Sequence, residues 1–212
     1  MKTRNCTFGV LGDSYSTFKG WIPEGNRRYY PLPTDVEDVL SVEQTWWHLL
    51  MQKRDLQLTV NDSFSGATVC EDNREGYPED SSFTRRAKRS FCNENAGKSQ
   101  LIFLFGCTND SWFDRTIGVD QYENWTEADL QQILPAYSYT IHTLKSNNPD
   151  AAIVAIINTD LKEEIRDGMI RAGEHYGIVN VILADIAKQN GHPTALGMTQ
   201  IAEQVDAALD LI

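Results

Sequence analysis

Five short runs of mainly apolar residues divide the chain, and each run has the length of a β-strand. They lie at residues 7–11, 56–60, 101–105, 152–157 and 178–183. The third and fourth runs are apolar at every position, which is typical of strands buried on both faces of a parallel sheet. The pattern therefore predicts a parallel sheet built from these five runs.

Between these runs, apolar residues recur at the spacing of one face of a helix. This spacing predicts long helices over residues 41–53, 126–145, 161–176 and 194–211, and a short basic helix over residues 82–91. Ser41 and Gln44 fit a capping box at the start of the first helix. Pro135 is expected to kink the second helix or to mark its true first turn. Gly177 is placed to end the third helix.

Strands that alternate with helices indicate βαβ units and a doubly wound α/β fold. Two polar stretches, residues 19–39 and 68–97, interrupt the alternation. Because neither stretch carries a core of its own, we predict a single domain over residues 1–212 with two insertions. Ligands of doubly wound sheets bind at the carboxyl ends of the strands, so the residues that follow each predicted strand are the candidates for a functional site.

Composition narrows the class of partner. The chain has 30 acidic and 19 basic residues, which gives a formal charge of −11. Because an acidic surface repels phosphate backbones and anionic lipid headgroups, we expect neither nucleic acid nor a membrane as partner, and a neutral or cationic small substrate fits the charge better. The four cysteines show no CxxC pair and no metal-ligand spacing, which favours free thiols and no metal site. No secretory leader or membrane-spanning run is visible, so we expect a cytoplasmic location.

Four of the predicted strand ends carry residues suited to acyl transfer. Ser14 follows the first strand, Gly66 the second and Asn109 the third, and His192 lies in the loop after the fifth. Taken singly, each residue also fits an ordinary turn or surface position. Together they supply a serine nucleophile, a backbone donor, an amide donor and a base at one edge of the sheet. The remaining histidines fall within predicted helices: His48, His142 and His175.

These blocks occur in the order found in SGNH hydrolases, and nearly the whole chain resembles the GDSL-type esterases of that superfamily. The matching residues are Ser14 in Gly12-Asp13-Ser14, Gly66, Asn109 in Thr108-Asn109-Asp110, and His192 before Pro193. The resemblance implies a three-layer α/β/α, flavodoxin-like fold with a five-stranded parallel sheet, no metal or organic cofactor, and ester hydrolysis through an acyl-enzyme. It also implies an oxyanion hole formed by the N–H groups of Ser14 and Gly66 and the Asn109 side chain.

Two positions depart from the family pattern. Cys107 stands where the family usually has a glycine. Gln189 stands three residues before His192, where the family usually has the aspartate of the catalytic triad. Asp185 is the nearest upstream carboxylate and is one candidate for orienting the His192 imidazole. The alternative is a Ser–His dyad in which a backbone carbonyl holds the imidazole.

The family resemblance implies carbohydrate deacetylation, lysophospholipase or short-acyl ester hydrolysis, or thioester hydrolysis. Because no long apolar stretch suggests a lid for lipid chains, we expect an acetyl or other short acyl group on a polar alcohol such as a carbohydrate. Several aromatic residues in the first insertion and after the third strand are candidates for sugar contacts or for covering a small core. They are Trp21, Tyr29, Tyr30, Trp112, Phe113 and Trp125.

Two other function classes stay open. A non-catalytic binding module on the same fold is favoured by the glutamine at position 189. A flavin or nucleotide protein is disfavoured, because residues 12–17 contain one glycine and Asp13 would repel phosphate. The basic helix predicted over residues 82–91 is interpreted as a solvated, ion-paired face. It contains Arg85, Arg86, Lys88 and Arg89. The sequence does not indicate an oligomeric state.

Overall fold

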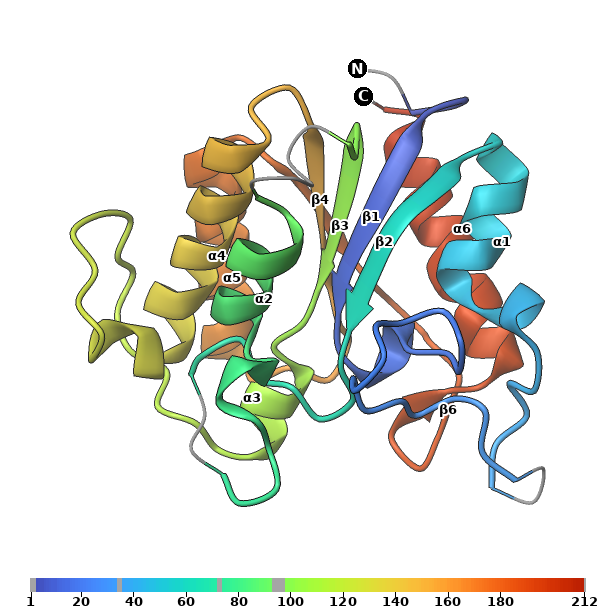
Figure 1. Cartoon of the computed structure of the whole chain (residues 1–212), viewed down its shortest axis with the longest axis horizontal. Helices are drawn as coiled ribbons and strands as arrows, with labels where there is room; N and C mark the ends of the chain where they lie inside the picture. Colours follow the sequence, from blue (N-terminus) through green and yellow to red (C-terminus); the bar gives the residue numbers. More distant parts are fainter. Residues whose placement is uncertain (1–2, 34–35, 72–73, 93–97, 212) are drawn as a thin grey trace.

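The computed structural model describes residues 3–33, 36–71, 74–92 and 98–211. Its centre is a twisted sheet of five strands (Figure 1), namely β1 (Thr7–Gly12), β2 (Gln57–Ser63), β3 (Leu101–Phe105), β4 (Ala152–Ile157) and β5 (Val179–Ile182). All neighbouring strands are parallel, and their order is β2-β1-β3-β4-β5. This is the flavodoxin-like order, which confirms the predicted fold class.

Helices cover both faces of the sheet (Figure 1). On one face lie α1 (Trp46–Arg54) and α6 (Ala195–Leu209), and on the other lie α2 (Phe83–Ser90), α4 (Ile133–Asn147) and α5 (Glu163–Tyr176). The double cover explains why β3 and β4 are buried at every position. Among the described residues, no helix combines the length and the apolar composition that a membrane span requires.

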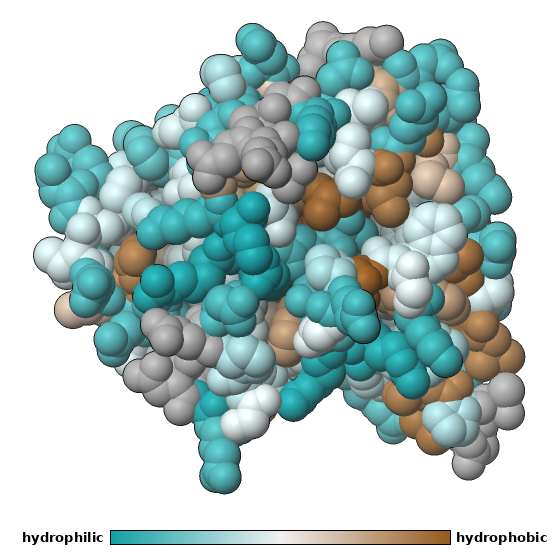
Figure 2. Space-filling model, in the orientation of Figure 1, coloured by the Kyte–Doolittle hydropathy of each residue, from teal (hydrophilic) through white to brown (hydrophobic). Residues whose placement is uncertain are grey.

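Shorter elements gather at the carboxyl ends of the strands, where Figure 1 shows α3 (Thr108–Trp112) and β6 (Lys188–Gln189). The other short elements are β7 (His192–Pro193) and the 3₁₀ turns η1 (Ser14–Ser16), η2 (Val42–Gln44), η3 (Glu79–Ser81) and η5 (Asp129–Gln131). In Figure 2 the outline of the molecule is indented at this same edge, and the visible face is largely hydrophilic.

The residues predicted to begin or end helices do so in the structure, although two helices begin later in the chain than their apolar pattern predicts. The capping box of Ser41 and Gln44 is present, but it caps η2, and α1 begins only after the extended Thr45. Likewise, α4 begins at Ile133, which places Pro135 in the first helical turn, where its missing N–H costs nothing. Gly177 ends α5 in the left-handed conformation as predicted.

One interpretation of the basic helix α2 is wrong. Arg85 and Arg89 pair with acidic side chains, as expected for an ion-paired face. Arg86, in contrast, is completely buried rather than solvated. Its Nε donates to the Ser81 carbonyl at 2.7 Å, and its Nη1 donates to the backbone carbonyl of Asp62. These contacts bind α2 to the carboxyl end of β2.

Candidate active site

Ser14 lies immediately after β1, and the local sequence explains the sharp turn there. A Cβ atom on Gly12 would lie 2.6 Å from the Ser63 Oγ, so the close approach of β1 and β2 requires glycine. The Asp13 Oδ1 then accepts the Tyr15 N–H at 3.0 Å and caps η1. The serine therefore sits on a fixed turn at the carboxyl edge of the sheet, with 2% of its surface exposed.

The structure brings His192 to this serine from 178 residues further along the chain. The His192 Nε2 and the Ser14 Oγ are 3.0 Å apart, which is hydrogen-bond distance. The predicted nucleophile and base are therefore in contact. The other histidines lie in helices that cover the sheet: His48 in α1, His142 in α4 and His175 in α5.

A short β-hairpin with a two-residue turn holds His192 in place. Sequence reasoning missed this hairpin. β6 and β7 pair antiparallel, with Gln189 opposite His192. Asn190 and Gly191 form the turn, with φ angles of 49° and 77°. Two positive φ angles are the mark of a type I′ turn, and Asn-Gly is its preferred sequence. The dipeptide was therefore a readable signal for this hairpin.

The partner of the His192 Nδ1 is a backbone carbonyl. The Asn190 oxygen lies 3.1 Å from the Nδ1. Because a carbonyl only accepts, the Nδ1 carries the proton and the Nε2 is free to accept one from Ser14. The prediction that Asp185 orients the imidazole is not met, since Asp185 is exposed and the Asn190 carbonyl occupies the position of a triad carboxylate. The geometry corresponds to the dyad alternative.

Aromatic rings surround the His192 imidazole. The Tyr29 ring is stacked on it, with centroids 3.6 Å apart and planes 8° apart. The pKa of His192 is lowered to about 4, mainly by burial. The hydrogen bond to Asn190 offsets part of this effect, and the nearby positive charge of Lys188 adds to it. The imidazole is therefore neutral near pH 7, which is the state that a general base requires.

The stacked tyrosine is itself tied to a buried carboxylate. The Tyr29 hydroxyl donates to the Glu37 Oε1 at 2.8 Å, and Glu37 is 1% exposed. The Tyr29 N–H donates to the Thr17 Oγ1 at 2.8 Å, which fixes the first insertion against the turn after β1. The Tyr29 ring therefore lies between the His192 imidazole and the Glu37 carboxylate in a chain of contacts. Sequence reasoning singled out Tyr29 as an aromatic candidate but gave no signal for Glu37.

Gly66 and Asn109, the predicted oxyanion donors, are joined through Ala67, the residue that follows Gly66. The Asn109 Nδ2 donates to the Ala67 carbonyl at 2.9 Å, and an amide nitrogen has a second N–H to offer. The Asp110 carboxylate accepts the N–H groups of Val69 and Cys70, at 2.9–3.2 Å, and so clamps the same loop. These contacts hold the loop after β2 against the first turn of α3.

Cys107 explains why the family prefers glycine at this position. Its φ is 68° and its ψ is −4°, a left-handed conformation that is strained for residues with a Cβ. The side chain is completely buried, and burial raises the pKa of its thiol well above the ordinary value. The Cys107 side chain is therefore accommodated in the core, at the residue that precedes α3.

A polar chain below the site connects α3 to the hairpin. The Thr108 Oγ1 accepts the Asn158 Nδ2 at 3.1 Å. The Asn158 Oδ1 in turn accepts the Lys188 Nζ at 2.9 Å. The Asn158 side chain therefore links α3 to β6. The pKa of Asp13 is raised to about 7, because desolvation outweighs the opposing effect of the hydrogen bond from the Tyr15 N–H.

The aromatic candidates divide between the site and the core. Trp112 lies beside the catalytic pair, with its ring 5.7 Å from the His192 ring and 43% of its surface exposed. Tyr30 is completely buried and donates its hydroxyl to the Pro193 carbonyl at 2.7 Å. Trp21 packs on Trp47, and Trp125 packs on Tyr139, in both cases away from the catalytic pair.

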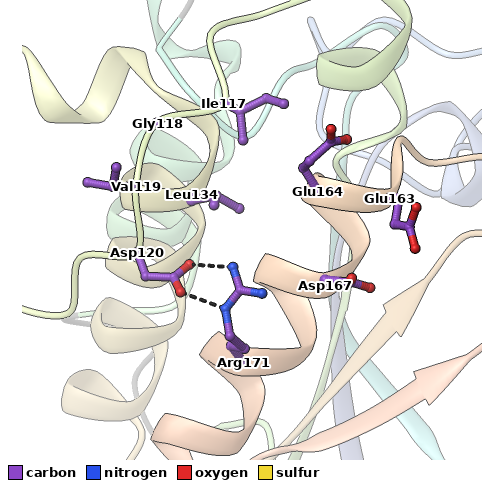
Figure 3. Close-up of a pocket in the computed structure, with 9 residues that line it drawn as sticks. All are labelled: Ile117, Gly118, Val119, Asp120, Leu134, Glu163, Glu164, Asp167 and Arg171. Carbon is purple, nitrogen blue, oxygen red and sulfur yellow. Dashed lines mark hydrogen bonds and ion pairs between the residues drawn. The ribbon is translucent and has the colours of Figure 1, made fainter.

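A large cavity of about 760 Å³ lies elsewhere, between α5 and the segment before α4. Figure 3 shows its lining, in which an Arg171–Asp120 ion pair faces acidic side chains and a small apolar wall. The lining residues are Ile117, Gly118, Val119, Asp120, Leu134, Glu163, Glu164, Asp167 and Arg171. This cavity contains no nucleophile paired with a base, so it is not the candidate active site.

Sequence comparison identifies related proteins over the whole chain. The profile of the family described as GDSL-like Lipase/Acylhydrolase matches residues 6–209. A structure from Bacteroides uniformis ATCC 8492, described as a GDSL-like lipase, is 41% identical with a TM-score of 0.89, covering 98% of this chain and 96% of its own. A second, from Bacteroides ovatus ATCC 8483 and described in the same way, is 37% identical with a TM-score of 0.89, covering 98% and 99%. No curated protein shows a significant match.

Two esterases of carbohydrates share the fold at low identity. One is a carbohydrate esterase, 15% identical with a TM-score of 0.69, and the match covers 99% of this chain and 69% of that protein. The other is an acetyl xylan esterase from the rumen bacterium Butyrivibrio proteoclasticus, 15% identical with a TM-score of 0.63, and the match covers 100% and 64%. At this identity the likeness concerns the fold.

Proposed function

Because the chain belongs to the GDSL-like lipase/acylhydrolase family, and is thereby an ester hydrolase of the SGNH type, we propose that it removes an acetyl or similarly short acyl group from a carbohydrate or other polar alcohol. The observation that carries the proposal is the 3.0 Å contact between the Ser14 Oγ and the His192 Nε2. A serine hydroxyl needs such a base to become a nucleophile at neutral pH.

The reaction proceeds in two halves through an acyl-enzyme. The Ser14 Oγ attacks the ester carbonyl and gives its proton to the His192 Nε2. The oxyanion accepts hydrogen bonds from the N–H groups of Ser14 and Gly66 and from the Asn109 amide. The carbon–oxygen bond to the alcohol then breaks, and the alcohol leaves with the proton from the Nε2. Water repeats the sequence on the acyl-serine, which releases the acid and returns the proton to the Ser14 Oγ.

The surroundings of the pair support a short acyl group and a polar alcohol. Ser14 and His192 are 2% and 9% exposed, so a substrate carbonyl must enter a narrow opening. The broad exposed ring of Trp112 beside His192 offers a surface on which a sugar ring packs well. The similar folds of a carbohydrate esterase and an acetyl xylan esterase support the same substrate class.

The test compares ester hydrolysis by the wild type with that by Ser14→Ala and His192→Ala. We expect each variant to lose about a thousandfold or more of kcat with p-nitrophenyl acetate. The wild type should prefer acetate to octanoate esters and should release acetate from an acetylated xylo-oligosaccharide. Full activity in both variants would exclude the assignment.

The chain also offers a matched control. The Ser146 Oγ lies 3.4 Å from the His142 Nε2 on the exposed surface of α4, so this pair resembles the Ser14–His192 pair but is not buried at the carboxyl edge of the sheet. Ser146→Ala should keep wild-type activity. A fluorophosphonate probe should label Ser14 and not Ser146 when the labelled peptide is identified by mass spectrometry. Absence of labelling at Ser14 would favour a non-catalytic binding module.

A further inference from the structure

An exposed arginine, Arg27, lies beside the loop that carries the predicted oxyanion donor Gly66. The Ser65 N–H donates to the Arg27 carbonyl at 2.7 Å, which joins the two loops next to Gly66. The preceding residue, Asn26, donates its Nδ2 to the Asp62 Oδ1 at 2.7 Å and to the Ser63 carbonyl at 3.0 Å. The backbone of Arg27 is therefore fixed to the carboxyl end of β2.

The side chain of Arg27 reaches over a tyrosine that covers Gly66. A Cβ atom on Gly66 would lie 2.3 Å from the Tyr77 hydroxyl, so the phenol packs directly on the glycine. The Arg27 guanidinium lies 4.6 Å from the centre of the Tyr77 ring and donates to the Gly76 carbonyl at 3.1 Å. The Arg74 guanidinium lies 4.1 Å from the same ring and donates to the Gly66 carbonyl at 2.7 Å. Two cations thus flank the ring beside a predicted oxyanion donor.

Arg27 has no carboxylate partner among the residues that the structure describes, although acidic residues outnumber basic ones in the chain by 30 to 19. Its bond to Gly76 uses one of the five N–H donors of a guanidinium, and the side chain is exposed. A guanidinium fork matches a carboxylate in a bidentate way. One available guanidinium suits a monoanion better than a phosphate with nearly two charges.

We propose that Arg27, on the Tyr77 ring beside Gly66, binds a carboxylate group carried by the ester substrate, such as that of an acidic sugar. The inference rests on the proposed esterase function and names the substrate class of that same site. The net charge of the chain by itself favours neutral or cationic substrates. An anionic substrate is still compatible with this charge, because the two arginines beside Gly66 act at shorter range than the distributed acidic residues.

The test measures how strongly the enzyme prefers anionic esters. One pair of probes carries the charge on the alcohol side: 4-acetoxybenzoate and its neutral analogue 4-acetoxybenzamide. The other pair carries it on the acyl side: mono-4-nitrophenyl succinate and 4-nitrophenyl butyrate. For each pair we define the anion preference as the ratio of kcat/KM for the charged probe to that for the neutral probe. Comparing this ratio between variants cancels the intrinsic reactivity of the esters.

We expect Arg27→Gln to lower the anion preference about tenfold for one pair, and the affected pair identifies the side of the ester that carries the carboxylate. Added sodium chloride should lower the wild-type preference for the same pair. The control is Arg28→Gln, because Arg28 is also exposed and donates to the Pro31 carbonyl at 2.7 Å. Its anion preference should stay within about twofold of wild type.

Two results would overturn the inference. One is an unchanged anion preference in Arg27→Gln for both pairs, which includes an equal loss on charged and neutral probes. The other is the same loss of anion preference in Arg28→Gln. Each of these leaves the proposed function intact as long as the wild type hydrolyses the neutral esters and Ser14→Ala does not. Absence of hydrolysis of all four probes by the wild type would instead count against the esterase itself.

Discussion

At the scale of single residues, the main question is how His192 bears a positive charge without a triad carboxylate. Its Nδ1 faces a carbonyl, and Lys188 opposes protonation. The stacked Tyr29 ring presents its electron-rich face to the imidazole, and a cation on such a face is stabilised by up to about 2 kcal/mol when desolvated. The Glu37 carboxylate, which accepts a hydrogen bond from the Tyr29 hydroxyl, adds negative charge behind that ring.

We therefore expect Tyr29→Leu to lower kcat about tenfold with p-nitrophenyl acetate, with a smaller loss for Tyr29→Phe, because phenylalanine keeps the ring but not the link to Glu37. KM should change little, since the ring contacts His192. A matched control is Tyr122→Leu, because Tyr122 stacks on His175 at 3.9 Å and 7° in another part of the molecule. Equal kcat values for Tyr29→Leu and Tyr122→Leu would contradict the role of Tyr29.

The lowered pKa of His192 predicts how activity depends on pH. Because only the neutral imidazole accepts the serine proton, kcat/KM should stay constant from neutral pH to about pH 5 and fall through about pH 4. Lys188→Met should move this acidic limb to higher pH, since it removes a positive charge that opposes protonation. An acidic limb near the ordinary histidine value of about 6.5 in the wild type would contradict the prediction.

The same shift affects folding stability, with a defined sign. Between about pH 6.5 and pH 4 the unfolded chain binds a proton at His192 and the folded chain does not, so this residue makes the folded state less stable as the pH falls. Burial raises the pKa of Asp13, which gives a contribution of the opposite sign over an overlapping range. The effect of His192 is therefore measured as the difference in unfolding free energy between wild type and His192→Gln. From pH 7.5 to pH 5, wild type should lose about 2 kcal/mol of stability relative to His192→Gln.

At the scale of elements, the β6–β7 hairpin sets the base in register with the nucleophile. The turn at Asn190 and Gly191 aims the Asn190 carbonyl at the Nδ1, and the Tyr15 hydroxyl donates to the Gly191 carbonyl at 2.5 Å. Tyr15 directly follows the nucleophile. One hydrogen bond therefore connects the turn that carries Ser14 with the turn that carries His192.

We expect Gly191→Ala to lower kcat at least tenfold and to destabilise the fold by about 1 kcal/mol, because its φ of 77° is strained for alanine and the new Cβ would lie 3.1 Å from the Trp112 ring. Gly177→Ala is the control, since Gly177 has a φ of 61° at the end of α5 with nothing within 4 Å of the added Cβ. It should lose similar stability in a denaturant titration and keep wild-type kcat. Equal kcat values in both variants would show that the hairpin turn does not position the base.

The β6–β7 hairpin also separates what could be predicted from the sequence from what could not. The five strands and the order of the blocks with Ser14 and His192 followed from apolar periodicity and motif spacing, which depend on local sequence. The partner of the His192 Nδ1 could not be predicted in this way, because it depends on the path of the backbone between residues 185 and 192. The Asn-Gly dipeptide indicates a tight turn, and a tight turn places Gln189 across from His192 rather than beside its ring.

At the scale of the whole molecule, one buried ion pair fastens both insertions to the edge of the sheet. The Asp62 carboxylate at the end of β2 accepts hydrogen bonds from Asn26 of the first insertion and from Arg89 and Ser90 of α2. The Arg86 guanidinium lies 4.0 Å from the same carboxylate. A basic run on an acidic chain gives no sign of which of its members is buried, so this contact was beyond sequence reasoning.

Removing one partner of such a pair leaves buried polar groups without compensation, so we expect Arg86→Met to destabilise the fold by about 3 kcal/mol. Burial lowers the pKa of Arg86 to about 10, so the guanidinium is still charged at neutral pH and the loss should be constant between pH 6 and pH 8. The control is Lys88→Met, because Lys88 lies on the exposed face of α2, 4.9 Å from the centre of the Tyr139 ring, and its loss should change stability by less than about 1 kcal/mol.

Denaturant titration of the three proteins measures these differences, and the double variant Asp62→Asn with Arg86→Met tests the coupling. If the pair fastens the insertions, the double variant should lose less stability than the sum of its two single variants, because neither charge is then left alone in the core. Additive losses would mean that Asp62 and Arg86 stabilise the fold through separate contacts, with Asp62 held by Asn26 and Ser90 and Arg86 by the Ser81 carbonyl.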